Sequence, residues 1–198
     1  CIDNVVVVCN ANWLDYCQSI ISEFSLNKVR AVVAGGETGQ LSIHNGLLSA
    51  AKLSDPKKTV VLIHDGVRPL IDAGTIERNV ASVEEFGSSI TCVKAKETIL
   101  VKADDGVEIV PRENVLLARA PQGFWLSDIL TAHKMALDAG ETGCIDSATM
   151  MKAQGNDLHL IVGPDENIKI TTQDDYYSMR SILDSRENNQ LYAEGEDE

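Results

Sequence analysis

The stretch from Thr59 to Pro69 constrains the fold more than any other part of this sequence. Four apolar residues, Val60 to Ile63, follow one another without a polar interruption, and three of them are β-branched. This pattern is typical of a strand that is buried on both faces of a parallel sheet. The run then breaks into the polar loop His64-Asp65-Gly66-Val67-Arg68-Pro69. Ligands of open α/β sheets bind beyond the carboxyl ends of the strands, which is where such a loop projects.

Two interpretations of this loop follow from its residue types. A carboxylate such as Asp65 can hold a hard metal ion, and a guanidinium such as Arg68 can bind a phosphate. The alternative is an ordinary junction between a strand and a turn, with solvated charges. The stretch alone does not separate the two, so the rest of the chain has to.

The flanking sequence alternates between strand and helix patterns. We expect further strands at 5–8, 29–33 and 90–93, and helices at 14–24, 41–53 and 74–86. This alternation predicts an α/β fold with a Rossmann-like, doubly wound and mostly parallel sheet. The later elements are predicted as strands at 114–119 and 158–162, a rigid turn at 120–124, helices at 126–139 and 146–154, an extended segment at 168–172 and a last helix from 174 to about 183.

A hairpin interrupts this alternation. Residues 97–101 and 107–110 read as two strands around the turn Asp104-Asp105-Gly106. We therefore predict a β-hairpin arm over about 94–112 that protrudes from the domain and contacts a partner subunit; a solvent-exposed decoration is the alternative. The domain is expected to span 1–184, with an acidic polar tail at 185–198.

Composition excludes several classes of function. The 198 residues include 30 acidic and 17 basic ones, for a net charge of −13. Nucleic acids and anionic membranes need a cationic face, so neither is expected as a partner. Five cysteines without a C-x-x-C pair argue against a zinc site or a disulfide framework and favour the cytoplasm. The sequence has no apolar run of about eighteen residues that would span a membrane.

Several short motifs lie where strands are expected to end. They are Gly35-Gly36-Glu37 with Ser42, His64 to Pro69, Arg112, Pro121-Gln122 and Asn167-Ile168-Lys169. Their order and spacing resemble the polyol-phosphate cytidylyltransferases, the family of 2-C-methyl-D-erythritol 4-phosphate and ribitol-5-phosphate cytidylyltransferases. The resemblance covers Ile2 to about Leu183 and implies a sheet of the nucleotide-diphospho-sugar transferase type. It also implies a homodimer held through the arm.

The resemblance implies a role for each matching residue. Gly35, Gly36, Glu37 and Ser42 would contact the cytidine of CTP. Asp65 would hold a catalytic Mg²⁺, with Glu166 as a weaker candidate ligand, and would also face the nucleotide. Arg68 would fix either the phosphate of the acceptor or the loop itself, and Lys169 would lie against the acceptor phosphate or the α-phosphate. Thr98 and Arg112, on the arm, would grip the polyol phosphate across the dimer interface.

The sequence departs from the family pattern in three places. Ala120 stands where the family has the Thr of its Thr-Pro-Gln-x-Phe motif. Gly39 and Gln40 stand where an Arg is common in the family's Gly-Gly-acid segment. The family's first strand and its glycine-rich loop, which cradles the triphosphate, have no counterpart here, so we expect them upstream of Cys1 in the parent protein.

The expected reaction is transfer of CMP from CTP to a polyol phosphate with release of pyrophosphate. The resemblance implies an acceptor of the ribitol 5-phosphate or methylerythritol 4-phosphate type. The stretch Asn10-Ala-Asn12-Trp13 resembles the ribitol-type branch, whose members tend to have an aspartate and a Trp at this point. A second hypothesis is a catalytically incomplete nucleotide-binding or scaffold domain of the same fold. A dinucleotide-binding domain is disfavoured, because no G-x-G-x-x-G follows a strand.

Overall fold

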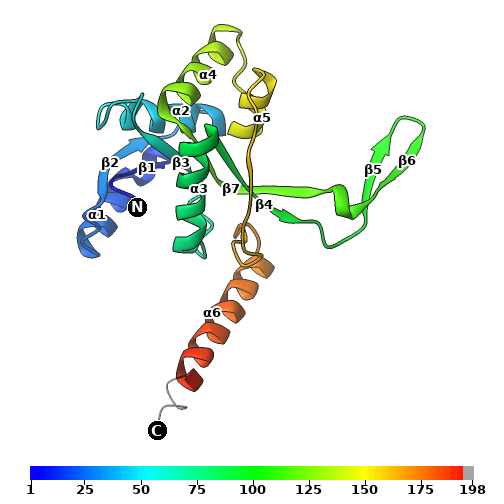
Figure 1. Ribbon diagram of the computed structural model, residues 1–198. Coiled ribbons are helices and arrows are strands. Elements are labelled where there is room, and N and C mark those ends of the chain that lie inside the picture. Colours follow the sequence, from blue (N-terminus) through cyan, green and yellow to red (C-terminus); the bar gives the residue numbers. More distant parts are fainter. Residues whose placement is uncertain (194–198) are drawn as a thin grey trace.

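The computed structural model describes residues 1–193, whose elements follow the predicted order (Figure 1). The strands are β1 (Val5–Cys9), β2 (Val29–Ala34), β3 (Val60–Ile63), β4 (Ser88–Lys94), β5 (Ile99–Ala103), β6 (Gly106–Val110), β7 (Leu116–Trp125) and β8 (Leu160–Val162). The helices are α1 (Leu14–Glu23), α2 (Gly39–Ala50), α3 (Ala73–Phe86), α4 (Leu126–Asp138), α5 (Ser147–Ala153) and α6 (Gln173–Ala193), with short 3₁₀ turns at Ala11–Trp13 and Arg112–Asn114.

The strands form an α/β arrangement, as expected, but in separate sheets. β1 and β2 pair in parallel, and β3, β7, β4 and β8 form a four-stranded sheet in that order. Within it β4 and β8 are parallel, whereas β7 runs antiparallel to both β3 and β4. The prediction that β3 is buried on both faces is wrong: its four residues are only half-buried, because β3 is an edge strand that pairs with β7 alone.

The predicted rigid turn at 120–124 is also wrong, because these residues continue β7. Pro121 cannot donate a backbone hydrogen bond, and the pairing of β7 with β4 shifts register between Ile90 and Cys92, opposite this part of β7. Gly123 lets the strands approach closely: a Cβ atom there would lie 2.6 Å from Ser89 Oγ and 2.7 Å from Leu62 Cδ2. Sequence rules for proline and glycine therefore read an irregular strand as a turn.

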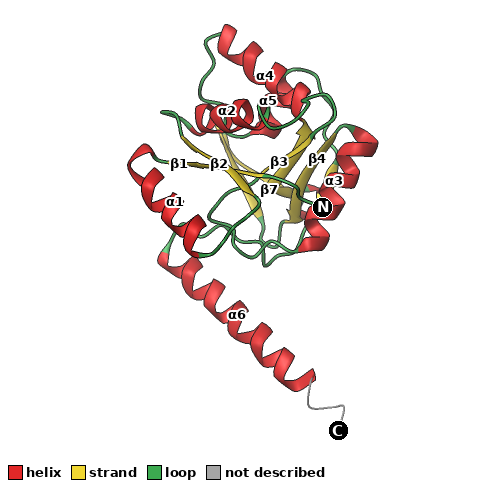
Figure 2. Cartoon of the chain, turned by 90° about the vertical axis from the view of Figure 1, so that its left-hand side faces the viewer, coloured by secondary structure: helices red, strands yellow, loops and turns green. Residues whose placement is uncertain are grey.

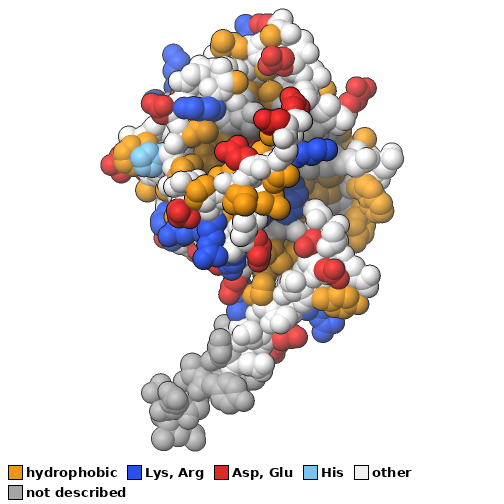
Figure 3. All heavy atoms as spheres, turned by 90° about the vertical axis from the view of Figure 1, so that its right-hand side faces the viewer, with side chains coloured by type: hydrophobic (Ala, Val, Ile, Leu, Met, Phe, Trp, Pro, Cys, Tyr) orange, Lys and Arg blue, Asp and Glu red, His pale blue; other side chains and the backbone are white. Residues whose placement is uncertain are grey.

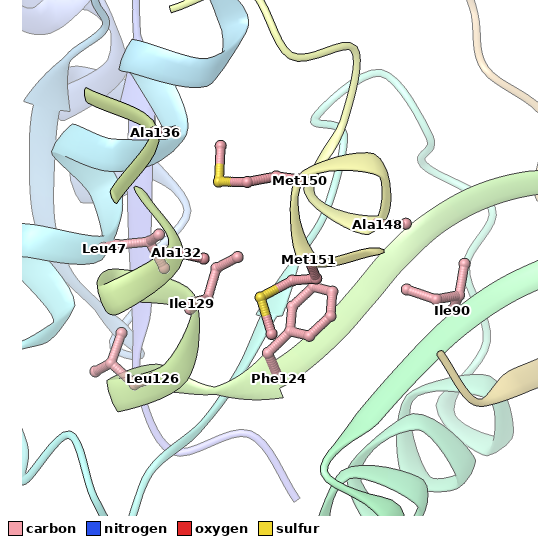
Figure 4. Packing of buried hydrophobic residues seen from close by; sticks show 10 residues of the cluster. All are labelled: Leu47, Ile90, Phe124, Leu126, Ile129, Ala132, Ala136, Ala148, Met150 and Met151. Carbon is pink, nitrogen blue, oxygen red and sulfur yellow. The ribbon is translucent and has the colours of Figure 1, made fainter. Parts of the chain in front are cut away.

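Helices cover the sheets from both sides. α2, α4 and α5 lie together over one side of the strands (Figure 2), while α3 packs against β3, β4 and β7. The buried core lies where α4 and α5 meet β7, and Phe124, Leu126 and Ile129 at its centre are fully buried (Figure 4). The remaining members of this core are Leu47, Ile90, Ala132, Ala136, Ala148, Met150 and Met151.

Two segments leave this body (Figure 1). β5 and β6 form the predicted hairpin, which extends away from the sheets as an arm. α6 runs to Ala193, beyond its predicted end near Leu183, so residues 185–193 of the predicted tail are helical. The last five residues of that tail, 194–198, lie outside the described residues.

Residues 168–172, expected to be extended, pair with no strand. Within the described residues, no helix has the length and apolarity that crossing a membrane requires, and all five cysteines are free thiols.

His133 on α4 is a buried polar side chain inside this core. It is 1% exposed, and neither of its ring nitrogens has a hydrogen-bond partner. Its ring stacks on that of His44 in α2, with 5.4 Å between the centroids. Burial, reinforced by the nearby His44, lowers the pKa of His133 to about 4.

We predict that this histidine makes the fold sensitive to mild acid. The unfolded chain takes up a proton on His133 near pH 6.5 and the folded chain only near pH 4, so stability is lost as the pH falls through this window. The loss amounts to roughly 3 kcal/mol at pH 4. Urea unfolding of the wild type and of His133→Met from pH 7 to pH 4 measures it. The wild type is expected to lose more stability than the variant, and parallel curves would contradict the prediction.

Candidate active site

The first group of predicted residues forms the turn between β2 and α2. The amide of Gly36 donates to Ser42 Oγ at 3.0 Å, and the Ser42 hydroxyl donates to the Thr38 carbonyl at 2.9 Å. A Cβ atom at Gly35 would lie 2.8 Å from Ser42 Oγ, and one at Gly36 would overlap the Leu41 side chain. The structure thus gives the two glycines and Ser42 a structural task, which is to fold this loop tightly onto the first turn of α2. Glu37 extends from the loop into solvent.

The loop after β3 brings its charged residues together. The Arg68 amide closes a turn onto the Asp65 carbonyl at 3.0 Å, and Arg68 Nε donates to Asp65 Oδ2 at 2.9 Å. The ring Nε2 of His64 lies 3.0 Å from the Arg68 carbonyl, so His64 helps to shape this loop. Asp65 is therefore held in a defined direction by its own loop.

A second loop, residues 164–169, packs against the first. Arg68 Nη1 donates to the Asn167 carbonyl at 2.9 Å, and the Arg68 side chain is only 10% exposed. The sequence left two roles open for Arg68, binding the acceptor phosphate or fixing the loop. The structure shows the second, because Arg68 binds Asp65 in its own loop and the Asn167 carbonyl in the other. Lys169 Nζ lies 3.4 Å from Asp65 Oδ1 and is 47% exposed, so it remains open to a ligand.

These cations govern the charge of Asp65. Partial burial alone would raise the pKa of Asp65, but the hydrogen bond from Arg68 and the charges of Lys169 and Arg68 outweigh it. The pKa of Asp65 therefore stays below its ordinary value, and the side chain is a carboxylate at neutral pH.

Arg119 on β7 belongs to the same cluster, and sequence reasoning missed it. Its Nη1 donates to the carbonyls of Asp165 at 2.8 Å and Asn167 at 3.0 Å, and it lies 3.4 Å from that of Pro164. The only signal in the sequence was a cation two residues before the Pro121-Gln122 motif. Its partners lie more than forty positions away, so no local pattern could reveal them.

The residues present fit Mg²⁺ only in part. The Glu166 carboxylate, a predicted ligand, forms an ion pair with Arg186 of α6. Across the described residues, no three His, Cys, Asp or Glu side chains come close enough to enclose a metal ion. Proteins commonly hold Mg²⁺ through one or two carboxylates together with substrate phosphates, and Asp65 meets this requirement. The donor set thus fits a metal that arrives with a nucleotide.

The remaining predicted residues lie outside this cluster. Thr98 and Arg112 are exposed at the base of the arm, where Arg112 Nη1 donates to the Lys96 carbonyl at 3.2 Å. No hydrogen bond or ion pair within residues 1–193 joins either of them to Asp65 or Lys169. The base of the arm does reach the second loop, because Lys96 Nζ lies 2.9 Å from Asp165 Oδ2.

Pro121-Gln122 supports the site from inside the fold. The Gln122 side chain is buried, donates to Asp146 Oδ2 at 2.9 Å and accepts from the Ala148 amide at 2.9 Å. Asp146 also caps α5 by accepting from the Thr149 amide at 2.8 Å. The motif thus joins β7 to the first turn of α5.

Comparison with known proteins gives a consistent result. Residues 1–185 match the family model described as "IspD: 2-C-methyl-D-erythritol 4-phosphate cytidylyltransferase". A ribitol-5-phosphate cytidylyltransferase of Streptococcus agalactiae is 50% identical over 97% of this chain and 81% of its own length. A 2-C-methyl-D-erythritol 4-phosphate cytidylyltransferase of Clostridium acetobutylicum is 34% identical over 92% of this chain and 78% of its own. The crystal structure of 4-diphosphocytidyl-2C-methyl-D-erythritol synthase from Anaerococcus prevotii, 28% identical, matches with a TM-score of 0.80 over 92% of this chain and 79% of that one. The predicted sheet type is therefore confirmed.

The close packing of the Gly35-Gly36 turn yields a paired prediction. Gly36→Ala should destabilise the fold by about 1 to 3 kcal/mol, because the new methyl group meets Leu41 and its carbonyl carbon at 3.1 Å. Gly39→Ala, three residues later, meets nothing within 4 Å and should leave stability unchanged or raise it slightly. Urea unfolding of both variants checks this, and equal stabilities would show that the turn tolerates a side chain.

Proposed function

The chain belongs to the 2-C-methyl-D-erythritol 4-phosphate cytidylyltransferase family of nucleotidyltransferases, and on this premise we propose that it transfers CMP from CTP to a polyol phosphate, with release of pyrophosphate. The observation that carries the proposal is the Asp65 carboxylate flanked by Arg68 and Lys169 at the carboxyl end of β3. Ribitol 5-phosphate is the proposed acceptor, because relatives named for it in Streptococcus agalactiae and Vibrio parahaemolyticus are 50% and 45% identical to this chain, whereas those named for the methylerythritol compound are 34 to 38% identical. A further relative named for ribitol 5-phosphate, from Lacticaseibacillus paracasei, is 33% identical.

In the proposed reaction a phosphate oxygen of the acceptor attacks the α-phosphorus of CTP. The nucleophile is already an anion, so neither a covalent intermediate nor a strong base is required, and catalysis rests on position and charge. Mg²⁺, held by Asp65 and the nucleotide phosphates, would neutralise charge on the triphosphate. Lys169 would bind a phosphate oxygen, and Arg68 would keep Asp65 and the second loop in register. We propose that the enzyme acts in the cytoplasm.

The assay is pyrophosphate release by the full-length protein, with CTP, Mg²⁺ and ribitol 5-phosphate. We predict turnover with ribitol 5-phosphate in preference to 2-C-methyl-D-erythritol 4-phosphate. Asp65→Asn should lower kcat/KM by at least about 100-fold, because it removes the charge that binds the metal while keeping the side-chain shape. Asp174→Asn, at the exposed start of α6, is the matched control and should retain activity.

Two outcomes would count against this function. Full activity in Asp65→Asn would remove Asp65 from the mechanism. No turnover together with no heat on titration of CTP and Mg²⁺ would favour the alternative of a scaffold domain.

We propose further that the protein is a homodimer held through the arm. In the hairpin Leu100 pairs with Ile109 and Lys102 with Val107, so Leu100, Val107 and Ile109 lie on one face. Their side chains are 63%, 65% and 67% exposed, an apolar surface that a lone arm leaves in water. Figure 3 views the molecule from this side, where hydrophobic side chains gather between acidic and basic ones. Thr98 and Arg112 at the base of the arm would then reach the partner's site.

The dimer prediction is tested on the arm itself. Ile109→Asp places a charge at the centre of the apolar face and should convert the dimer to a monomer at micromolar concentration, as measured by sedimentation equilibrium. Ala103→Asp, on the opposite face of the hairpin, is the control and should leave the dimer intact. A wild-type protein that sediments as a monomer would contradict the proposal.

A further inference from the structure

Two arginines from distant parts of the chain converge on a single backbone oxygen. The Asn167 carbonyl accepts from Arg68 Nη1 at 2.9 Å and from Arg119 Nη1 at 3.0 Å. Arg68 comes from the loop after β3, and Arg119 comes from β7. The two cations repel each other, and the pKa of Arg119 is lowered by burial and by the charge of Arg68, with Asp165 opposing. Placing two arginines on one carbonyl oxygen therefore has an electrostatic cost. We ask what the contacts of Arg119 contribute in return.

Arg119 binds a whole turn of the second loop rather than one atom. The carbonyls of Asp165 and Asn167 accept from its Nη1 at 2.8 and 3.0 Å, with that of Pro164 at 3.4 Å. One terminal nitrogen of the guanidinium, Nη1, thus contacts three carbonyl oxygens of this turn. Inside this turn the Asn167 amide donates to the Pro164 carbonyl at 3.2 Å and the Ile168 amide to the Glu166 carbonyl at 2.7 Å. Arg119 therefore stabilises a tight turn whose carbonyls would otherwise repel one another.

The turn that Arg119 holds leads directly into Lys169. On its near side, Asn167 Nδ2 donates to the Ala120 carbonyl at 2.7 Å, next to Arg119. On its far side, the Ile170 amide donates to the Val67 carbonyl at 2.8 Å, within the loop of Asp65. Lys169 lies between these two anchors, with its ammonium 3.4 Å from Asp65 Oδ1. The side chain is long and half-exposed, so its position depends on how firmly the backbone beneath it is fixed.

We infer that Arg119 is a positioning residue of the proposed active site, which sets Lys169 against Asp65 by clamping the carbonyls of residues 164–167. The inference rests on the proposed function, because Lys169 is there the group that binds a phosphate oxygen. Arg119 itself acts through Lys169 and touches no reacting atom in this scheme. The two arginines have different roles. Arg68 joins the turn to Asp65, and Arg119 stabilises the shape of the turn.

A double-mutant cycle on pyrophosphate release tests the coupling. Arg119→Gln should lower kcat about 30- to 100-fold, because a small displacement of a charged group is costly in transfer reactions, while KM for CTP changes less than about threefold. In the Lys169→Ala background, Arg119→Gln should cost less than about threefold, since the group that it positions is gone. Arg119→Lys should recover only part of the activity, because an ammonium is more strongly hydrated than a guanidinium and is therefore less suited to partly buried contacts.

An exposed arginine elsewhere in the chain serves as the control. Arg30→Gln removes an exposed arginine of β2 that contacts only Asn4 in the described structure, and it should leave kcat unchanged. A purely structural role would lower activity by the same factor with and without Lys169, and this result would overturn the inference. An unchanged kcat in Arg119→Gln would overturn it as well.

A measurement without substrate separates the clamp from the reaction. Hydrogen exchange of the Asn167, Ile168 and Ile170 amides should quicken at least about tenfold in Arg119→Gln and stay at the wild-type rate in Arg30→Gln. If the wild type shows no turnover, the proposed function fails while this readout still tests the clamp. Unchanged exchange at all three amides would refute the clamp whatever the activity.

Discussion

The contact between Arg68 and the Asn167 carbonyl is the one on which the site depends. Arg68 binds Asp65 at 2.9 Å with one nitrogen and the Asn167 carbonyl at 2.9 Å with another, so it joins two loops 99 positions apart. The first loop follows β3, and the second follows β8. Together with the bond from the Ile170 amide to the Val67 carbonyl, this contact fixes the position of the carboxylate relative to Lys169. A nearly buried guanidinium thus helps to join two strand ends into one site.

Several motif residues prove to support the site rather than to project from it. Ser42 closes the Gly35-Gly36 turn onto α2, and Gln122 joins β7 to α5. Both side chains make hydrogen bonds to backbone or capping groups, and their removal would leave those partners unpaired. Such positions are recognisable in a sequence for the same reason as catalytic ones, because substitution is costly. A sequence motif therefore marks positions where substitution is costly. The structure is needed to tell residues that hold the site in shape from residues that contact a substrate.

The sequence predicted the local elements well and the long-range ones poorly. The uninterrupted apolar run and the Asp-Asp-Gly turn identified β3 and the arm, because both signals are local in the chain. β7 was divided into a strand and a turn because Pro121 and Gly123 are usually turn residues, whereas here a register shift and close strand packing accommodate them. The end of α6 was missed because its polar residues carry no amphipathic pattern. Arg119 and the ion pair of Glu166 with Arg186 join distant segments, which only the fold brings together.

Charge distribution explains how an acidic chain suits anionic substrates. The chain has a net charge of −13, but β7 and the two loops place Arg68, Arg119 and Lys169 near Asp65. The other two carboxylates of the second loop, Asp165 and Glu166, form ion pairs with Lys96 and Arg186. Screening at physiological salt limits the influence of exposed distant charges to about 8 Å, so the local excess of cations determines the potential at the site. The two arginines are engaged with carbonyls and a carboxylate, which leaves Lys169, 47% exposed, as the solvent-accessible cation of these three. Arg68 and Arg119 thus hold the loops in place, and Lys169 is available to a phosphate.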